Sequence, residues 1–147
     1  MPDVIGIDHI YVTVVDFTRS VKFYDAVMGV LGFRKNEFEI NGDRHVQYYN
    51  RHFGYVLRPA RSERAYDPYT PGLHHLCFRV AEEADVRDAA RSLKAVSIAV
   101  SEPKLYAEYA ADYFAVFLSD PDGIRLEITN YRHERRARHD TWGKEEP

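Results

Sequence analysis

The chain has 147 residues, of which 45% are hydrophobic and 29% are charged. This composition is typical of a soluble globular protein, and the length suits one domain with a substantial core. The formal net charge of −3 argues against a general affinity for nucleic acids or anionic membranes. Basic residues gather at 132–138, but Glu134 interrupts them, so we expect a solvated tail or terminal helix there rather than a nucleic-acid surface.

Cys77 is the only cysteine, so the chain forms no internal disulfide, which suits a reducing compartment. The N-terminus lacks the basic and apolar regions of a signal peptide. No apolar run approaches the roughly 20 residues that a membrane helix needs. We therefore expect a cytoplasmic protein with neither a membrane nor a nucleic acid as partner.

The first half of the chain begins with a strand and a helix. Residues 4–14 end in a clear alternation, which predicts a strand with one apolar face and a polar face that carries His9. An amphipathic pattern follows, and we expect Asp16 or Thr18 to cap that helix. The remaining strands of this half are expected at 33–40, 44–50 and 55–59.

The second half repeats this order. The alternation returns at residues 73–80, with His75 in the place of His9, and a helix is expected at 82–95. The spacing also recurs, because 45 residues separate His9 from Gly54 and 48 separate His75 from Gly123. The remaining strands are expected at 97–101, 113–119 and 124–130, and residues 120–123 have the composition of a turn between the last two.

The sequence therefore predicts an α+β fold built from two βαβββ modules. They cover residues 1–60 and 73–130, with a linker at 61–72 and a polar tail at 131–147, all within one domain. If each helix covers the apolar face of its strands, the free faces pair into a cup-shaped, mostly antiparallel sheet with the helices outside.

Three side chains that bind metals face this cup by strand parity: His9, His75 and Glu127. Two imidazoles and one carboxylate suit Zn, Fe(II), Mn, Ni or Co, and they leave coordination positions open for a substrate. Each residue alone is more simply explained as a hydrogen-bonded strand residue. The recurrence of His9 at His75, with Glu127 on the same face, favours a metal site.

Other residues receive weaker assignments. Parity turns His74 toward the helix, as a strand-edge residue or a partner of a metal ligand, and we expect His45 and His52 to be surface residues beside a hairpin. No general acid or base is identifiable. The candidates for substrate binding are Tyr113, Arg125 and Arg58.

Three stretches resemble the vicinal oxygen chelate superfamily, the group of glyoxalases, bleomycin-resistance proteins and extradiol dioxygenases. They are residues 7–10 with Asp16 and 20–24, then 73–78, and then 117–127, and the last is the most specific. The resemblance implies paired βαβββ modules around a divalent metal, with His9, His75 and Glu127 as its ligands. It also implies a homodimer, in which the cup is sometimes built from both chains.

One departure bears on the activity. Glyoxalase I-like relatives usually have a fourth, acidic ligand in the last strand of the first module. Aligning Gly54 with Gly123 places Arg58 opposite Glu127, and residues 55–59 contain no acid. This favours a three-ligand site, as in extradiol dioxygenases and fosfomycin-type thiol transferases.

The expected function is that of a divalent-metal-dependent lyase, dioxygenase or transferase that acts on a small, oxygen-bearing substrate chelated to the metal. Dioxygenases of this group are usually longer chains, whereas a thiol transferase of the fosfomycin-resistance type fits the length and the ligand number. The alternative from another class is a small-molecule binding protein, as in bleomycin resistance, which would not need the three ligands.

Overall fold

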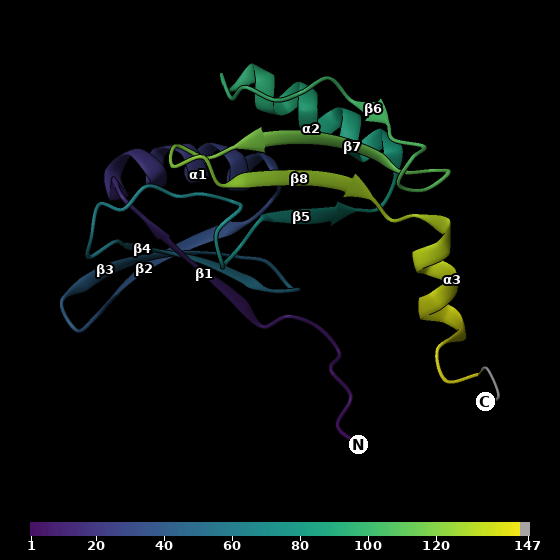
Figure 1. Cartoon of the computed structure of the whole chain (residues 1–147), viewed down its shortest axis with the longest axis horizontal. Helices are drawn as coiled ribbons and strands as arrows, with labels where there is room; N and C mark the ends of the chain where they lie inside the picture. Colours follow the sequence, from purple (N-terminus) through teal and green to yellow (C-terminus); the bar gives the residue numbers. More distant parts are fainter. Residues whose placement is uncertain (145–147) are drawn as a thin grey trace. The chain divides into compact units, whose positions relative to one another are not determined.

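The computed structural model describes residues 1–144. They form two compact units, one of Met1–Asp67 together with Asp120–Ile124, and one of Pro68–Ser119 together with the chain from Arg125 onward. Each unit contains one four-stranded mixed sheet and a helix in the order βαβββ, and the second unit has a further helix after its last strand (Figure 1). The prediction of an α+β fold with two such modules is confirmed.

The first unit has the strand order β1-β4-β3-β2. β1 pairs with β4 in parallel, and the other neighbours are antiparallel. Its elements are β1 (His9–Val14), α1 (Phe17–Val30), β2 (Arg34–Ile40), β3 (Asp43–Tyr49) and β4 (Gly54–Pro59).

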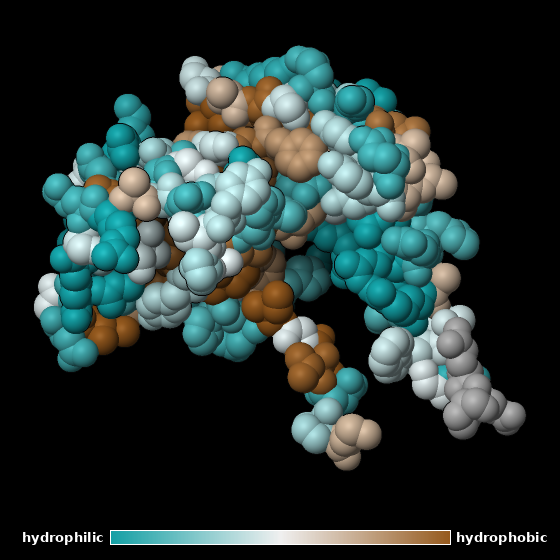
Figure 2. Space-filling model, in the orientation of Figure 1, coloured by the Kyte–Doolittle hydropathy of each residue, from teal (hydrophilic) through white to brown (hydrophobic). Residues whose placement is uncertain are grey.

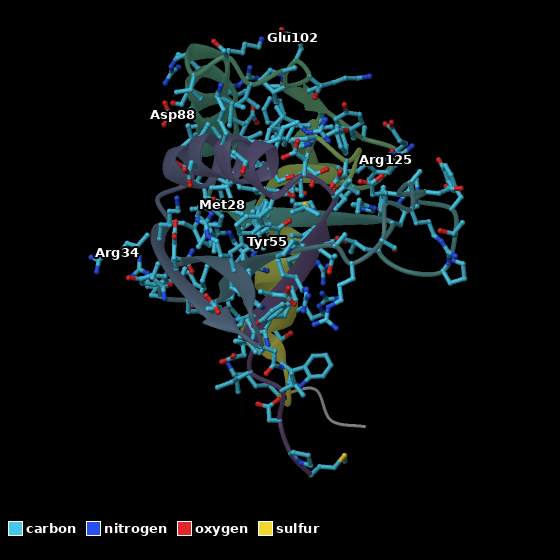
Figure 3. The ribbon with its side chains drawn as sticks, turned by 90° about the vertical axis from the view of Figure 1, so that its left-hand side faces the viewer. Met28, Arg34, Tyr55, Asp88, Glu102 and Arg125 are labelled. Atoms are coloured by element: carbon cyan, nitrogen blue, oxygen red, sulfur yellow. The ribbon has the colours of Figure 1, made fainter. Side chains whose placement is uncertain are left out.

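The alternation in β1 decides which face of this sheet is buried. Val12 and Val14 are buried, whereas His9 and Tyr11 are exposed, as the sequence predicts. The apolar face packs against α1, whose first turn is capped because Asp16 accepts a hydrogen bond from the backbone N–H of Arg19 at 3.0 Å. Met28 of α1 and Tyr55 of β4 are fully buried in this core (Figure 3).

A buried hydrogen-bond chain crosses the same core. The Tyr55 hydroxyl donates to the Tyr24 hydroxyl, and the Tyr24 hydroxyl donates to Asp120 Oδ2, both at 2.9 Å. The other oxygen of Asp120 accepts the backbone N–H groups of Asp122 and Ile124, both at 2.9 Å. Asp120 therefore shapes its own turn and ties that turn to α1, with only 5% of its surface exposed.

The second unit has the strand order β5-β8-β7-β6, with β5 and β8 parallel and the other neighbours antiparallel. Its apolar face packs against the second helix, whose buried side is apolar as predicted. The elements are β5 (His75–Val80), α2 (Glu83–Ala95), β6 (Lys104–Leu105), β7 (Phe114–Ser119), β8 (Arg125–Asn130) and α3 (His133–Thr141).

The strand predicted at 97–101 is wrong. Ser97 adopts a left-handed φ of 63°, which interrupts an extended chain directly after the helix. Ser101 nevertheless reaches β7, because its hydroxyl accepts the backbone N–H of Phe117 at 2.8 Å and its own N–H donates to the Phe117 carbonyl at 2.9 Å. The short edge strand β6 forms a few residues later.

The predicted polar tail contains the helix α3, and residues 145–147 of the tail lie outside the described part of the chain. None of the residues of α3 is buried, and hydrophilic side chains cover it (Figure 2). Within residues 1–144, no helix has the length and apolar character to cross a membrane.

Candidate metal site

His75 and Glu127 lie on neighbouring parallel strands of the second unit. The register pairs His75 with Arg125 and Cys77 with Glu127, so the two side chains share one face of the sheet. His75 Nε2 lies 3.6 Å from Glu127 Oε2. The carboxylate is buried, with 3% of the residue exposed, while about half of the imidazole remains open to solvent.

The second nitrogen of His75 is already engaged. Its Nδ1 lies 2.8 Å from Nδ1 of His74, so one ring donates a hydrogen bond to the other. We assign the proton to His75 Nδ1, which leaves a lone pair on Nε2, the arrangement found in metal-binding histidines. His74 directly precedes β5 and contacts His75, in agreement with the expectation of a strand-edge residue. It is exposed, so the expectation that it faces the helix is wrong.

Glu127 is held by Tyr113, which directly precedes β7. The Tyr113 hydroxyl donates to Glu127 Oε1 at 2.5 Å. Desolvation and then this hydrogen bond raise the pKa of Tyr113, so its hydroxyl stays protonated and remains a donor at neutral pH. One carboxylate oxygen is thereby occupied, and the other is the one that faces His75.

Aromatic rings surround this carboxylate. Phe117 stands directly across the β7–β8 ladder from Glu127. Tyr106 packs edge-on against Phe117, with ring centroids 5.4 Å apart, and Tyr109 packs edge-on against Tyr113 at 5.3 Å. The loop that carries Tyr106 and Tyr109 thus supplies an apolar wall, which strengthens electrostatic interactions at Glu127.

Cys77 is a neighbour of Glu127 on the same face. Although the residue is partly open to solvent, desolvation of the thiol and then the charge of Glu127 raise the pKa of Cys77 to about 12. The thiol is therefore protonated at neutral pH, and a thiol is a much poorer metal ligand than a thiolate.

The pair His75 and Glu127 fits a divalent ion. Ligand bonds of about 2.1 Å in a tetrahedral site put two donor atoms about 3.4 Å apart, close to the observed 3.6 Å. Within residues 1–144, no cluster of three or more His, Cys, Asp or Glu side chains has the spacing to hold a metal. The pair consequently needs a further donor.

His9 has the same local environment in the first unit. It is the first residue of β1 as His75 is of β5, and the preceding residue again holds its Nδ1, since Asp8 Oδ2 lies 2.6 Å away. A carboxylate accepts but does not donate, so His9 Nδ1 carries a proton and donates to Asp8, and Nε2 is the ligand atom of the neutral ring. With the proton of His75 assigned to Nδ1, the neutral histidines of the two modules are the same tautomer.

An open pocket of about 640 Å³ lies on the polar face of the first sheet. Gly54 lines this pocket, and a Cβ at this position would come within 2.7 Å of Gln47 Nε2 and 3.5 Å of His9 Cβ. The absence of a side chain at Gly54 thus leaves the space that the Gln47 amide occupies. Other residues along the pocket include Tyr11, Asn36, Phe38 and Tyr49.

The ladder register corrects the counterpart of Glu127. Two residues after each histidine, Tyr11 pairs with Val56 in the first sheet and Cys77 pairs with Glu127 in the second. Val56, and not Arg58, therefore occupies the equivalent position. The conclusion drawn from Arg58 is unchanged, because Val56 is no acid either.

Arg58 and Arg125 differ as candidates for substrate binding. Arg58 Nη2 lies 2.6 Å from Asp43 Oδ2, an oxygen that Arg61 also contacts at 3.0 Å. Hydrogen bonds from Arg61 and then Arg58 hold the pKa of Asp43 below its ordinary value, so Arg58 is already paired with an ionised carboxylate. Arg125 is exposed beside His75, and its guanidinium donates to the Tyr69 hydroxyl at 3.3 Å.

His45 was expected at the surface, and that expectation is wrong. Only 2% of the residue is exposed. Its ring stacks on Phe38 with centroids 5.0 Å apart, lies edge-on to Tyr11 at 5.7 Å, and contacts the Asp43 carbonyl through Nδ1 at 2.8 Å. The alternation along β3 could have placed His45 on the same face of the sheet as Tyr11. Its burial, however, is due to side chains of neighbouring strands.

The comparison with protein families agrees with these features. The model described as Glyoxalase/Bleomycin resistance protein/Dioxygenase superfamily matches residues 6–128. The chain belongs to this superfamily. Its members commonly use divalent metals, bind small molecules and often dimerise.

Individual relatives are distant. The virulence protein STM3117 of Salmonella typhimurium is 25% identical over 129 residues, which cover 85% of this chain and 83% of that protein. A glyoxylase/bleomycin resistance protein/dioxygenase domain from Frankia sp. EAN1pec is similar in structure, with a TM-score of 0.71 at 20% identity, covering 88% of this chain and 100% of that one. The fosfomycin resistance protein FosX from Listeria monocytogenes has a TM-score of 0.64 at 15% identity, covering 91% and 99%. At these identities the two structures support the fold alone.

Proposed function

We propose that this protein is a divalent-metal-dependent enzyme that acts on a small substrate with adjacent oxygen atoms, and that His9, His75 and Glu127 hold the ion. The observation that carries the proposal is the approach of His75 Nε2 to Glu127 Oε2 at 3.6 Å, with the opposite atom of each group already engaged. Zn, Fe(II), Mn, Ni and Co all suit this donor set.

The other residues have distinct tasks in this proposal. A bound divalent ion supplies Lewis acidity toward negative charge on substrate oxygens. Tyr113 keeps Glu127 Oε2 as the ligating oxygen, while His74 and Asp8 fix the imidazole protons on the far side of each ring. Of the predicted substrate-binding residues, we assign that role to Arg125, because its exposed guanidinium suits an anionic group next to His75.

The pocket of the first unit suits the remainder of a small substrate. Asn36 and Gln47 offer carboxamide donors and acceptors, and the rings of Tyr11 and Phe38 offer apolar faces. His9 lines the same pocket, so a molecule bound there would reach the proposed metal ligand of this unit. Because superfamily members often dimerise, we include a homodimer in the proposal.

A metal-free binding protein is the second candidate, and the pocket itself favours it, because its volume and lining do not depend on an ion. This function would need neither the fixed imidazole protons nor the aligned carboxylate. A thiol transferase of the fosfomycin-resistance type remains within the first proposal, as one possible reaction of the metal enzyme.

Metal analysis separates the two candidates. Protein purified without chelators is expected to contain about one divalent ion per chain, and His75→Ala is expected to lose most of it, because an imidazole is removed from the ligand set. Elemental analysis by mass spectrometry measures both. The matched control is His133→Ala, an exposed histidine at the start of α3.

Two results would count against the enzyme. A wild-type protein that remains metal-free after incubation with each candidate ion would leave the binding protein as the better explanation. An ion that is retained equally by wild type and His75→Ala would place the metal elsewhere on the chain.

A further inference from the structure

Arg132 is a buried charge that the proposed site does not explain. It directly precedes α3, and only 9% of the residue is exposed. Its Nε is buried and has no hydrogen-bond partner among the described residues, and its Nη2 reaches the largely exposed Glu134 only at 3.5 Å. Burying a guanidinium with so few hydrogen bonds costs free energy of folding. The other contact that this side chain makes therefore bears on its role.

That contact is the ring of Tyr113. The guanidinium carbon of Arg132 lies 4.4 Å from the ring centroid, within the range of a cation–π interaction. The hydroxyl of the same ring donates to Glu127 Oε1. A continuous line of contacts therefore runs from the guanidinium through the ring to the carboxylate.

The backbone on both sides of this contact is fixed. Asn130 donates to the Asp112 carbonyl at 2.9 Å and accepts the Phe114 N–H at 3.1 Å, so it holds the residues that flank Tyr113. The Asp112 side chain accepts the His133 N–H at 2.8 Å, next to Arg132. These bonds keep the guanidinium against the ring even though α3 itself buries no residue.

We propose that Arg132 is a positioning residue for the metal ligand Glu127 and acts through Tyr113. The cation fixes the plane of the ring, and its charge makes the phenol O–H a stronger hydrogen-bond donor to Oε1. Oε2 is then held toward His75. This inference rests on the proposed function, and it adds a residue that lies outside the region matched by the family model, which ends at residue 128.

The test is a Zn²⁺ titration of purified variants by calorimetry. Residues that hydrogen-bond to a metal ligand and orient it typically contribute about 10- to 100-fold to metal affinity. Tyr113→Phe and Arg132→Met are therefore each expected to weaken Zn²⁺ binding about tenfold. In the Tyr113→Phe background, Arg132→Met is expected to cause little further loss, because its effect passes through the hydroxyl. Arg132→Lys should restore much of the affinity, since an ammonium group also binds an aromatic face.

Arg136→Met is the matched control. Arg136 also stacks on a tyrosine, with its guanidinium carbon 4.4 Å from the ring of Tyr131, and it also anchors α3 through the Ala81 carbonyl. A general loosening of α3 would therefore affect both variants. Circular dichroism confirms that each variant is folded before titration.

Each outcome has one meaning. If Arg132→Met binds Zn²⁺ as the wild type does, while His75→Ala does not bind, the role of Arg132 is refuted and the proposed function stands. Equal losses in Arg132→Met and Arg136→Met, or fully additive losses with Tyr113→Phe, also refute it, because they indicate a merely structural effect. If the wild type binds no Zn²⁺ or other divalent ion, the proposed function fails and this inference fails with it.

Discussion

Asp120→Ala is expected to lower the free energy of unfolding by about 3–5 kcal/mol, because it leaves several buried donors without an acceptor at about 1–3 kcal/mol each. The Tyr24 hydroxyl and the backbone N–H groups of Asp122 and Ile124 all donate to this carboxylate. Tyr24 has no exposed surface, so water cannot readily replace the lost acceptor. Urea unfolding followed by circular dichroism measures the difference.

Asp3→Ala is the control, because Asp3 is exposed near the N-terminus and should change the stability by less than about 0.5 kcal/mol. A loss in Asp120→Ala no larger than that of the control would show that the hydrogen-bond chain contributes little. Tyr24→Phe should show a smaller loss than Asp120→Ala, because the turn keeps its two backbone hydrogen bonds to Asp120.

The burial of Asp120 also predicts that the stability of the protein depends on pH. Desolvation raises the pKa of Asp120 above its ordinary value, partly opposed by its hydrogen bonds. The folded state therefore binds this proton more tightly than the unfolded state, and the associated stability is present below the unfolded pKa and lost as pH rises through the folded pKa. Asp120→Asn cannot ionise, so the stability of the wild type relative to Asp120→Asn should fall between pH 3 and 7. A rise over that range would contradict the stated direction of the shift.

Glu127→Gln should have the largest effect on metal binding. We expect the affinity for Zn²⁺ to fall by about 100-fold or more, because the loss of a ligating carboxylate should exceed the 10- to 100-fold typical of its supporting partners. The amide has the same shape, and its oxygen can still accept the hydrogen bond of Tyr113. Competition with a chromophoric chelator measures the affinity.

The fold of Glu127→Gln should be unaffected, since a neutral amide is easier to bury than a carboxylate. Unfolding in urea should therefore show a stability equal to or above that of the wild type. Glu63→Gln, at an exposed position of the linker, serves as the matched control for the loss of one negative charge. Unchanged affinity in Glu127→Gln would remove this residue from the ligand set.

Much of the fold could be predicted because the chain carries the same pattern twice. Alternating apolar residues set the faces of β1 and β5, and the same parity put His75 and Glu127 on one face, in agreement with the ladder register. Assigning a side chain to one face of a strand requires only the extent of the strand and its buried side. The assignment can therefore be made even when the neighbouring strands are unknown.

Features that depend on contacts between distant segments could not be predicted. The burial of His45 comes from rings on neighbouring strands. Val56 takes the place expected of Arg58 because ladder register, and not the spacing from a glycine, sets which residues correspond. The stacking of Arg132 on Tyr113 depends on hydrogen bonds of Asn130 and Asp112 that a local pattern does not reveal.

Whether His9, His75 and Glu127 hold one and the same ion is tested most directly by a Co²⁺ titration of the wild type and of His9→Ala, followed by the visible absorption of the bound metal. We expect about one Co²⁺ per chain in the wild type, and in His9→Ala both a weaker affinity and a changed spectrum, because one nitrogen ligand is removed. Identical affinity and an identical spectrum in His9→Ala would show that His9 is not a ligand and would contradict the proposed three-residue site.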